Sequence, residues 1–256
     1  MVSTDLTAQK GSVVLLRGLA RQAAHWGDVP AKLQQSLGMP VYCPDLPGMG
    51  LACHETVPWT LAEHVQLLKR RLEQHVPKPW HLVGLSLGGM VALELALQAQ
   101  ADVQSVVLIN SSASNLTPFY QRLQWRRYPT VLRCFYQDAQ QREALILQLT
   151  SRQASPHPAL WRWQQLALAQ PLRKSAVLKQ LWAASRYQLA TTPTCQGLVV
   201  VSDGDQLVSP RCSERLAQTL HWPLVRHASA GHDLPLDDAP WLIAQLQHFY
   251  QSWSSN

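Results

Sequence analysis

The feature that most constrains this chain is a G-x-S-x-G pattern at residues 84–88, which a second glycine follows directly. The residues before it, 81–83, form a short, mostly apolar run that is typical of a buried strand. The residues after it, 90–99, are rich in Ala, Leu and Met and contain neither Pro nor Gly, which favours a helix. A strand, a tight turn and a helix are the context in which this pattern carries a nucleophile.

In that context Ser86 is the candidate nucleophile. Glycines at Gly84 and Gly88 let the strand and the helix pass closely, where a Cβ would clash. The backbone N–H of Leu87, at the start of the helix, then points at the group that Ser86 attacks. The competing interpretation is an ordinary turn, so the decision depends on whether an acid and a histidine follow in suitable places.

A serine needs a neighbouring base, and the base needs an orienting acid. The candidate acid is Asp205, which follows an apolar run at residues 197–201. The candidate base is His232, which precedes the last predicted helix. The order serine, acid, histidine is the one expected when such a turn carries the nucleophile. Asp203 remains a rival acid, whereas Asp233, the sequence neighbour of His232, is poorly placed to reach that imidazole.

Length and composition suit one large domain, or one domain with an insert. The 256 residues are 46% hydrophobic, which is enough for a sizeable core, and no apolar run approaches the roughly 20 residues of a membrane span. Residues 1–11 show no basic-then-apolar signal pattern, so we expect a cytoplasmic protein. The five cysteines are widely spaced and lack C-x-x-C, which favours reduced thiols. No metal and no cofactor is expected.

Apolar runs alternate with helical patterns in the first and last parts of the chain. This alternation predicts an α/β fold, a mostly parallel sheet with helices on both faces, whose sites form at the carboxyl ends of the strands. A capping box at Thr60 and Glu63 marks one helix start. The expected strands are residues 13–16, 41–43, 81–83, 105–109, 197–201 and 224–226, and the main expected helices are residues 26–37, 61–76, 90–99 and 241–250.

Strand signals stop in the helical segment, our name for residues 116–190. It holds eleven Lys and Arg but two acids, so it carries +9, while the rest of the chain carries −3. This charge favours an anionic substrate, an acidic carrier protein or a lipid surface; solvated arginines are the simpler explanation. No nucleic-acid partner is expected from charge alone. Six aromatic residues are candidates for an acyl pocket, or for plain helix packing: Phe119, Tyr120, Trp125, Trp161, Trp163 and Trp182.

These motifs resemble the α/β-hydrolase family, in particular its small esterase-like members, over nearly the full chain. The resemblance implies a core of residues 1–115 and 191–256, with residues 116–190 as a helical cap over the active site. It also implies a serine hydrolase that cleaves a carboxylic ester or thioester through an acyl-enzyme on Ser86. The resemblance rests on Asp45-Leu46-Pro47-Gly48-Met49-Gly50, Gly84-Leu85-Ser86-Leu87-Gly88-Gly89, Asp205-Gln206-Leu207-Val208 and Gly231-His232-Asp233.

The first core strand is where this chain departs from the family, which has a His-Gly pair there. Here the pair is Arg17-Gly18, followed by Leu19, whose backbone N–H is the second candidate oxyanion donor beside that of Leu87. Arg17 either forms a salt bridge within the protein or places a charge near the mouth of the site. Asp45 is expected to structure its own loop.

Two alternatives to ester hydrolysis stay open. One is a binding or scaffold protein that keeps the fold without catalysis, and Arg17 is the feature that favours it. The other is a lyase or acyltransferase that uses the same triad. The expected partner is a small-molecule ester or thioester, anionic or carrier-bound, and the sequence does not indicate an oligomeric state.

Overall fold

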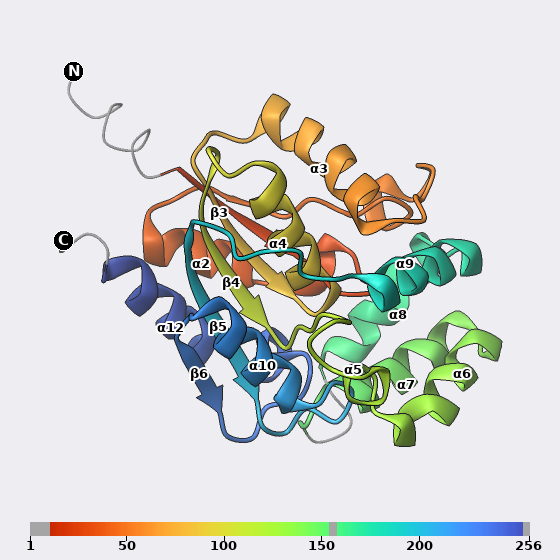
Figure 1. Ribbon diagram of the computed structural model, residues 1–256. Helices are drawn as coiled ribbons and strands as arrows, with labels where there is room; N and C mark the ends of the chain where they lie inside the picture. The colour runs from red at the N-terminus through yellow and green to blue at the C-terminus, as the bar shows by residue number, and fades with distance from the viewer. Residues whose placement is uncertain (1–10, 154–157, 253–256) are drawn as a thin grey trace.

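The computed structural model describes residues 11–153 and 158–252 (Figure 1). The N-terminal residues 1–10, on which the expectation about a signal pattern depends, lie outside the described residues. Within these ranges six strands form one sheet in the order β2-β1-β3-β4-β5-β6, and each neighbouring pair is parallel. The strands are β1 (Ser12–Leu16), β2 (Val41–Tyr42), β3 (Trp80–Leu85), β4 (Val103–Ile109), β5 (Gln196–Ser202) and β6 (Leu224–His227). The α/β prediction is therefore confirmed.

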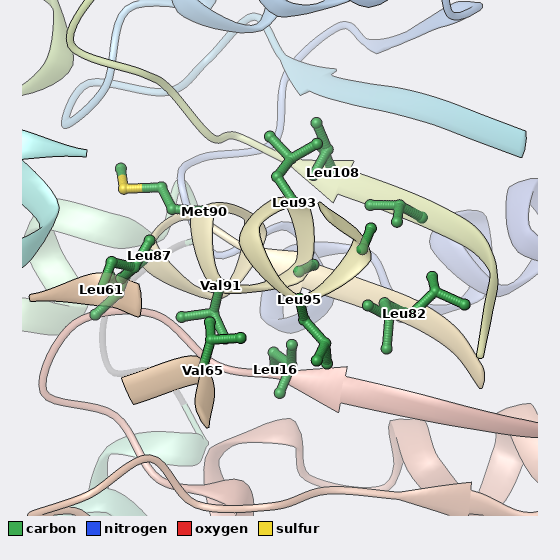
Figure 2. Close-up of a cluster of buried hydrophobic side chains, with 14 of the residues drawn as sticks. Leu16, Leu61, Val65, Leu82, Leu87, Met90, Val91, Leu93, Leu95 and Leu108 are labelled. Carbon is green, nitrogen blue, oxygen red and sulfur yellow. The ribbon is translucent and has the colours of Figure 1, made fainter. Parts of the chain in front are cut away.

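The strands divide their side chains between two hydrophobic layers, because successive residues of a strand point to opposite faces. One layer contains Leu16 and Leu82 and packs against α3 (Leu61–His75), α4 (Leu87–Gln98) and α10 (Pro210–Leu220). Figure 2 shows this layer around α4, with Leu93 and Leu95 among the strand side chains. The other layer contains Leu15 and packs against α2 (Val29–Leu37) and α12 (Ala239–Gln251). Helices therefore cover both faces of the sheet.

Two helix starts test the local sequence rules: one agrees with the prediction and the other does not. The capping box is present at α3, where the Glu63 N–H donates to Thr60 Oγ1 at 3.3 Å and the Thr60 N–H donates to Glu63 Oε2 at 3.2 Å. The prediction of one helix over residues 26–37 is wrong at its start. A 3₁₀ turn, η1 (Ala23–Trp26), comes first, then Gly27 takes a φ of +63°, and α2 begins at Val29 with a proline in its first turn.

The described residues of the helical segment form helices and loops, as expected. The helices are α5 (Phe119–Arg122), η3 (Trp125–Arg127), α6 (Tyr128–Tyr136), α7 (Ala139–Thr150), α8 (Ala159–Ala169) and α9 (Lys174–Arg186). They lie together at one side of the molecule, at the right of Figure 1. In the described part of the chain, every helix falls short of the length and apolarity that crossing a bilayer requires.

Candidate active site

Ser86 lies at the turn between β3 and α4 with a φ of +57° and a ψ of −117°. Non-glycine residues rarely adopt a positive φ, so the turn is strained. The glycines permit it, because a Cβ on Gly84 would lie 2.3 Å from the Gly88 carbonyl oxygen. A Cβ on Gly88 would in turn lie 2.1 Å from the carbonyl oxygen of Leu16 in β1. The predicted strand–turn–helix arrangement is thus present, and it requires glycine at both positions.

His232 and Asp205 come together in loops that follow β6 and β5. The imidazole Nδ1 of His232 lies 2.7 Å from Asp205 Oδ2, and both side chains are buried. The other carboxylate oxygen, Asp205 Oδ1, accepts the N–H groups of Leu207 at 2.8 Å and Val208 at 2.9 Å, which hold the carboxylate in place. The rival acid Asp203 is at the surface, paired with Arg226. The geometry therefore joins His232 to Asp205.

The electrostatic surroundings of His232 favour its protonated form. Burial of the imidazole is the largest single influence and lowers its pKa, but the negative charge and hydrogen bond of Asp205, together with the carboxylate of Asp233, outweigh it. Arg17 opposes this shift more weakly. The pKa of His232 is raised above its ordinary value as a result. A buried imidazole so oriented can accept a proton from a hydroxyl at Nε2 while Asp205 stabilises the imidazolium that forms.

Asn110 links the nucleophile turn to the histidine loop, a role that sequence reasoning did not assign. It follows β4, where the carbonyl of Ile109 accepts the Ser86 N–H at 2.8 Å. Its side-chain Nδ2 donates to the carbonyl of His232 at 2.9 Å, and its Oδ1 accepts the Ser202 N–H at 2.8 Å. The sequence contains a signal for this role, because a polar residue directly after a buried strand lies at the edge of the sheet where sites form.

The loop that follows β1 passes beside the nucleophile. A Cβ on Gly18 would lie 3.3 Å from Ser86 Cβ and 3.9 Å from Ser86 Oγ, so a side chain there would crowd Ser86 by a few tenths of an ångström. Leu19 comes next, and Ala20 after it has a φ of +57°. Helix α4 begins at Leu87, directly after Ser86. The two candidate oxyanion donors thus belong to backbone that flanks Ser86.

Arg17 forms a salt bridge within the protein, which was one of the two alternatives left open by the sequence. Its Nη2 lies 2.6 Å from Asp233 Oδ2 and its Nη1 donates to Asp233 Oδ1 at 3.1 Å. The guanidinium also lies 4.9 Å from the centre of the Trp26 ring. Arg17 and Asp233 are buried, so this pair ties the end of β1 to the residue next to His232.

The helical segment contacts three loops that carry candidate site residues, those of Leu19, Asp205 and His232. Beside the loop of Leu19, the N–H of Ala20 donates to Gln180 Oε1 at 3.2 Å. Beside the acid, Gln124 Nε2 donates to the carbonyl of Asp205 at 3.0 Å. Beside the histidine, the N–H of Asp233 donates to the carbonyl of Thr150 at 2.8 Å. These bonds attach the segment to the three loops, and no local pattern in the sequence indicated them.

A buried ion pair adds to these attachments. Arg21, in the loop after β1, lies 2.5 Å from Glu143 of α7, and its guanidinium stacks over Trp163 at 4.2 Å from the ring centre. The ring of His25 also packs against Trp163, and burial together with the nearby Arg21 lowers its pKa, so this histidine stays neutral. The pair therefore fixes α7 and α8 against the loop of the candidate oxyanion donor.

The six aromatic candidates for an acyl pocket do not share one environment. Of these six residues, all of them described, Trp163 is buried and takes part in the packing just given. The other five are exposed: Phe119, Tyr120, Trp125, Trp161 and Trp182. The six residues are therefore not gathered in one buried cluster, and a role in an acyl pocket stays a prediction.

Asp45 structures its loop, as expected, since its carboxylate accepts the N–H groups of Ala23 at 2.6 Å and Leu51 at 2.8 Å. A Cβ on Gly50 would lie 2.1 Å from this carboxylate, so the loop closes tightly around it. Across residues 11–153 and 158–252, no group of three or more His, Cys, Asp or Glu side chains is arranged to hold a metal ion.

Comparison with known proteins identifies the family and the fold. The model of a family described as the alpha/beta hydrolase family matches residues 13–245. A putative lipase from Acinetobacter baumannii shares the fold with a TM-score of 0.79 at 23% identity, over 97% of this chain and 86% of that one. An esterase from Exiguobacterium antarcticum does so with a TM-score of 0.78 at 16% identity, over 94% and 91% of the two chains.

Two groups of curated relatives are similar in sequence. A pimeloyl-[acyl-carrier protein] methyl ester esterase of Vibrio vulnificus is 33% identical over 139 residues, which is 52% of this chain and 50% of the relative. A putative carbamate hydrolase, RutD, of Cronobacter turicensis is 29% identical over 240 residues, which is 86% of this chain and 83% of the relative. The match to the first relative thus spans half of its length.

Proposed function

Since the chain belongs to the alpha/beta hydrolase family, we propose that it is a serine hydrolase that cleaves a carboxylic ester or thioester through an acyl-enzyme on Ser86. The observation that carries this proposal is the 2.7 Å contact of the buried His232 with Asp205, in a protein whose serine lies at a strained turn. A strained turn and a buried charged pair both cost stability, and a scaffold without catalysis has no physical need of either.

The proposed reaction begins when His232 Nε2 takes the proton of the Ser86 hydroxyl and Ser86 Oγ attacks the substrate carbonyl. The backbone N–H groups of Leu19 and Leu87 stabilise the resulting oxyanion, and one such donor contributes on the order of 3–4 kcal/mol in a serine hydrolase. The tetrahedral species collapses to an acyl-serine as His232 gives its proton to the leaving alcohol or thiol. Water, activated by His232, then releases the acid and restores Ser86.

Residues 116–190 are proposed to be the cap that determines the substrate. Their bonds to Ala20, Asp205 and Asp233 support a cap that is attached to the core beside the site. Their charge of +9 suits an anionic or carrier-bound substrate, in line with relatives named for acting on an acyl-carrier-protein ester. A carbamate is the second candidate substrate, because the match to the putative carbamate hydrolase covers most of both chains.

Active-site labelling with a fluorophosphonate probe, read by intact mass, tests the proposal. We expect one label per chain on the native protein, none on Ser86→Ala, and turnover of p-nitrophenyl butyrate that the substitution abolishes. No label and no turnover of short or long esters would contradict a serine hydrolase and favour the scaffold. Transfer of the acyl group to an added alcohol, in place of hydrolysis, would identify an acyltransferase.

A further inference from the structure

Helix α6 is mostly apolar, and yet none of its nine residues, all described, is buried. Its polar side chains, Thr130 and Arg133, are three positions apart and share one side of the helix, which leaves the other sides apolar. An apolar helix side normally packs against protein or lipid. In this fold α6 packs on α7 and lies at the outer edge of the molecule, at the lower right of Figure 1. Part of its apolar surface therefore faces outward, at Pro129, Leu132 and Tyr136.

The outward side of α6 forms a continuous stripe with the preceding turn. Trp125, Pro129, Leu132 and Tyr136 are all exposed and recur at spacings of four, three and four residues, which places them on one face of a helix. The exposed fractions are 62% for Trp125, 60% for Leu132 and 85% for Tyr136. Together they are a ridge with aromatic side chains at both ends and two non-aromatic ones, Pro129 and Leu132, between. We call these four residues the α6 stripe.

Exposed arginines lie beside the α6 stripe, and one exposed acid, Asp138, follows it in the chain. Residues 119–137 contain four arginines and no acid, and none of the four forms an ion pair within the described part of the chain. Two of them, Arg126 and Arg133, are exposed, and the guanidinium of Arg126 lies 5.5 Å from the Trp125 ring centre. A second copy of this chain would bring the same arginines against these, which disfavours self-association.

We propose that the α6 stripe docks on an anionic lipid surface. Trp, Tyr and Leu on one side of a helix, with arginines beside them, is the composition of helices that lie in the interface of a bilayer. Aromatic side chains settle at the headgroup level, and arginines attract acidic headgroups. A convex ridge suits a deformable lipid surface better than a protein partner, because a protein needs a matching groove. The proposal concerns binding alone and does not depend on the chemistry of Ser86.

Vesicle co-flotation of the full chain tests this docking. Native protein is expected to float with vesicles containing phosphatidylglycerol and not with vesicles of phosphatidylcholine alone. Binding is expected to be lost in about 1 M NaCl, where the screening length falls to about 3 Å. Ser86→Ala should float like the native protein, so that this result and the test of the proposed function are independent.

Substitutions in the α6 stripe provide the decisive comparison. Leu132→Glu and Tyr136→Glu are each expected to lower the partition coefficient by about tenfold or more, and Arg133→Gln by about fivefold for the loss of one charge. The matched control is Leu178→Glu on α9. Leu178 is 52% exposed but lies outside the α6 stripe, so this variant should bind vesicles as the native protein does. Thermal unfolding checks that each variant is folded.

Three outcomes overturn the proposal. The first is native protein that fails to float with acidic vesicles at low salt. The second is loss of flotation in the α9 control to the same degree as in the stripe variants. The third is a different partner for the α6 stripe. That partner would be either a second copy of the chain, seen as dimers by analytical ultracentrifugation, or a soluble acidic carrier protein that binds while vesicles do not.

Discussion

Arg17 and Asp233 form a buried, two-pronged ion pair across 216 positions of the sequence, with contacts of 2.6 and 3.1 Å. The pair joins the end of the first sheet strand to the residue beside His232. A side chain at this point in the chain, where the family has histidine, thus holds the residue next to the candidate base. Breaking such a pair leaves one charge buried and unpaired, which costs far more than removing both.

We therefore predict that Arg17→Met lowers the free energy of unfolding by about 3–5 kcal/mol, as measured by urea denaturation. The double variant Arg17→Met, Asp233→Leu should recover part of that loss, because it leaves no charge without a partner. The control is Arg226→Met, which removes exposed pairs with Asp203 and Glu214 and should cost about 1 kcal/mol or less for each pair. Equal losses in the single and double variants would contradict a specific pairing.

The choice of acid predicts an asymmetry between two aspartates. Asp205→Asn should lower kcat for p-nitrophenyl butyrate by about 10⁴-fold, because the amide no longer orients and stabilises the imidazole correctly. Asp203→Asn, two residues away, should leave kcat within about threefold, since its carboxylate pairs with Arg226 at the surface. Comparable losses in the two variants would mean that the contact between His232 and Asp205 is not used in the reaction.

The raised pKa of His232 predicts the pH dependence of activity. The base must be neutral to accept a proton, so kcat/KM should rise with pH through the pKa of His232, at a value above the ordinary one of about 6.5. In Asp205→Asn the residual activity should inflect at lower pH, because the main interaction that raises the pKa is gone. An inflection that does not move would exclude Asp205 as the cause.

The contribution of His232 to the free energy of unfolding should fall as pH rises, whereas the activity should increase. Because the folded-state pKa of His232 is raised, the interaction with Asp205 contributes fully below the unfolded-state pKa and is lost as pH rises through the folded-state pKa. The difference in unfolding free energy between native protein and Asp205→Asn should therefore shrink as pH rises through that value. Urea denaturation at several pH values measures it, and a difference that grows with pH would contradict the sign.

The contact between Gln180 and Ala20 predicts that a side chain of the helical segment affects catalysis. Gln180→Leu keeps the volume but leaves the N–H of Ala20 without its acceptor, beside the proposed oxyanion donor Leu19. We expect kcat to fall about tenfold with little change in KM, because the loop would hold the donor less well for the transition state. Gln164→Leu, on the exposed side of α8, is the control and should leave kcat unchanged. A rise in KM alone would indicate a role in substrate binding.

The close packing around Gly88 predicts that even an alanine at this position lowers the stability of the protein. Gly88→Ala would place a Cβ against the Leu16 carbonyl oxygen at 2.1 Å, so backbone has to move, and a loss of stability at or above about 1–3 kcal/mol is expected. Gly38→Ala is the control, because that Cβ meets nothing within 4 Å and the loss reflects its φ of +64° alone. Thermal unfolding compares the two variants, and a smaller loss at Gly88 would contradict the close approach.

The sequence by itself determined the elements and their chemistry. Hydrophobic periodicity, the capping box and the glycines around Ser86 are local properties, since they depend on residues within a few positions of one another. They suffice to predict the parallel sheet, the turn that carries the serine and the helical nature of residues 116–190. They failed at the start of α2, where one glycine with a positive φ outweighs the helical pattern.

Only the tertiary structure decided which side chains meet. Two aspartates follow β5, and the contact of Asp205 with His232 depends on how the loops after β5 and β6 turn toward each other. The partner of Arg17, the hydrogen bonds of Asn110 and the contact of Gln180 with Ala20 likewise join residues far apart in the chain. Sequence patterns report the direction of a side chain within its own element, whereas these contacts arise from the packing of several elements at one edge of the sheet.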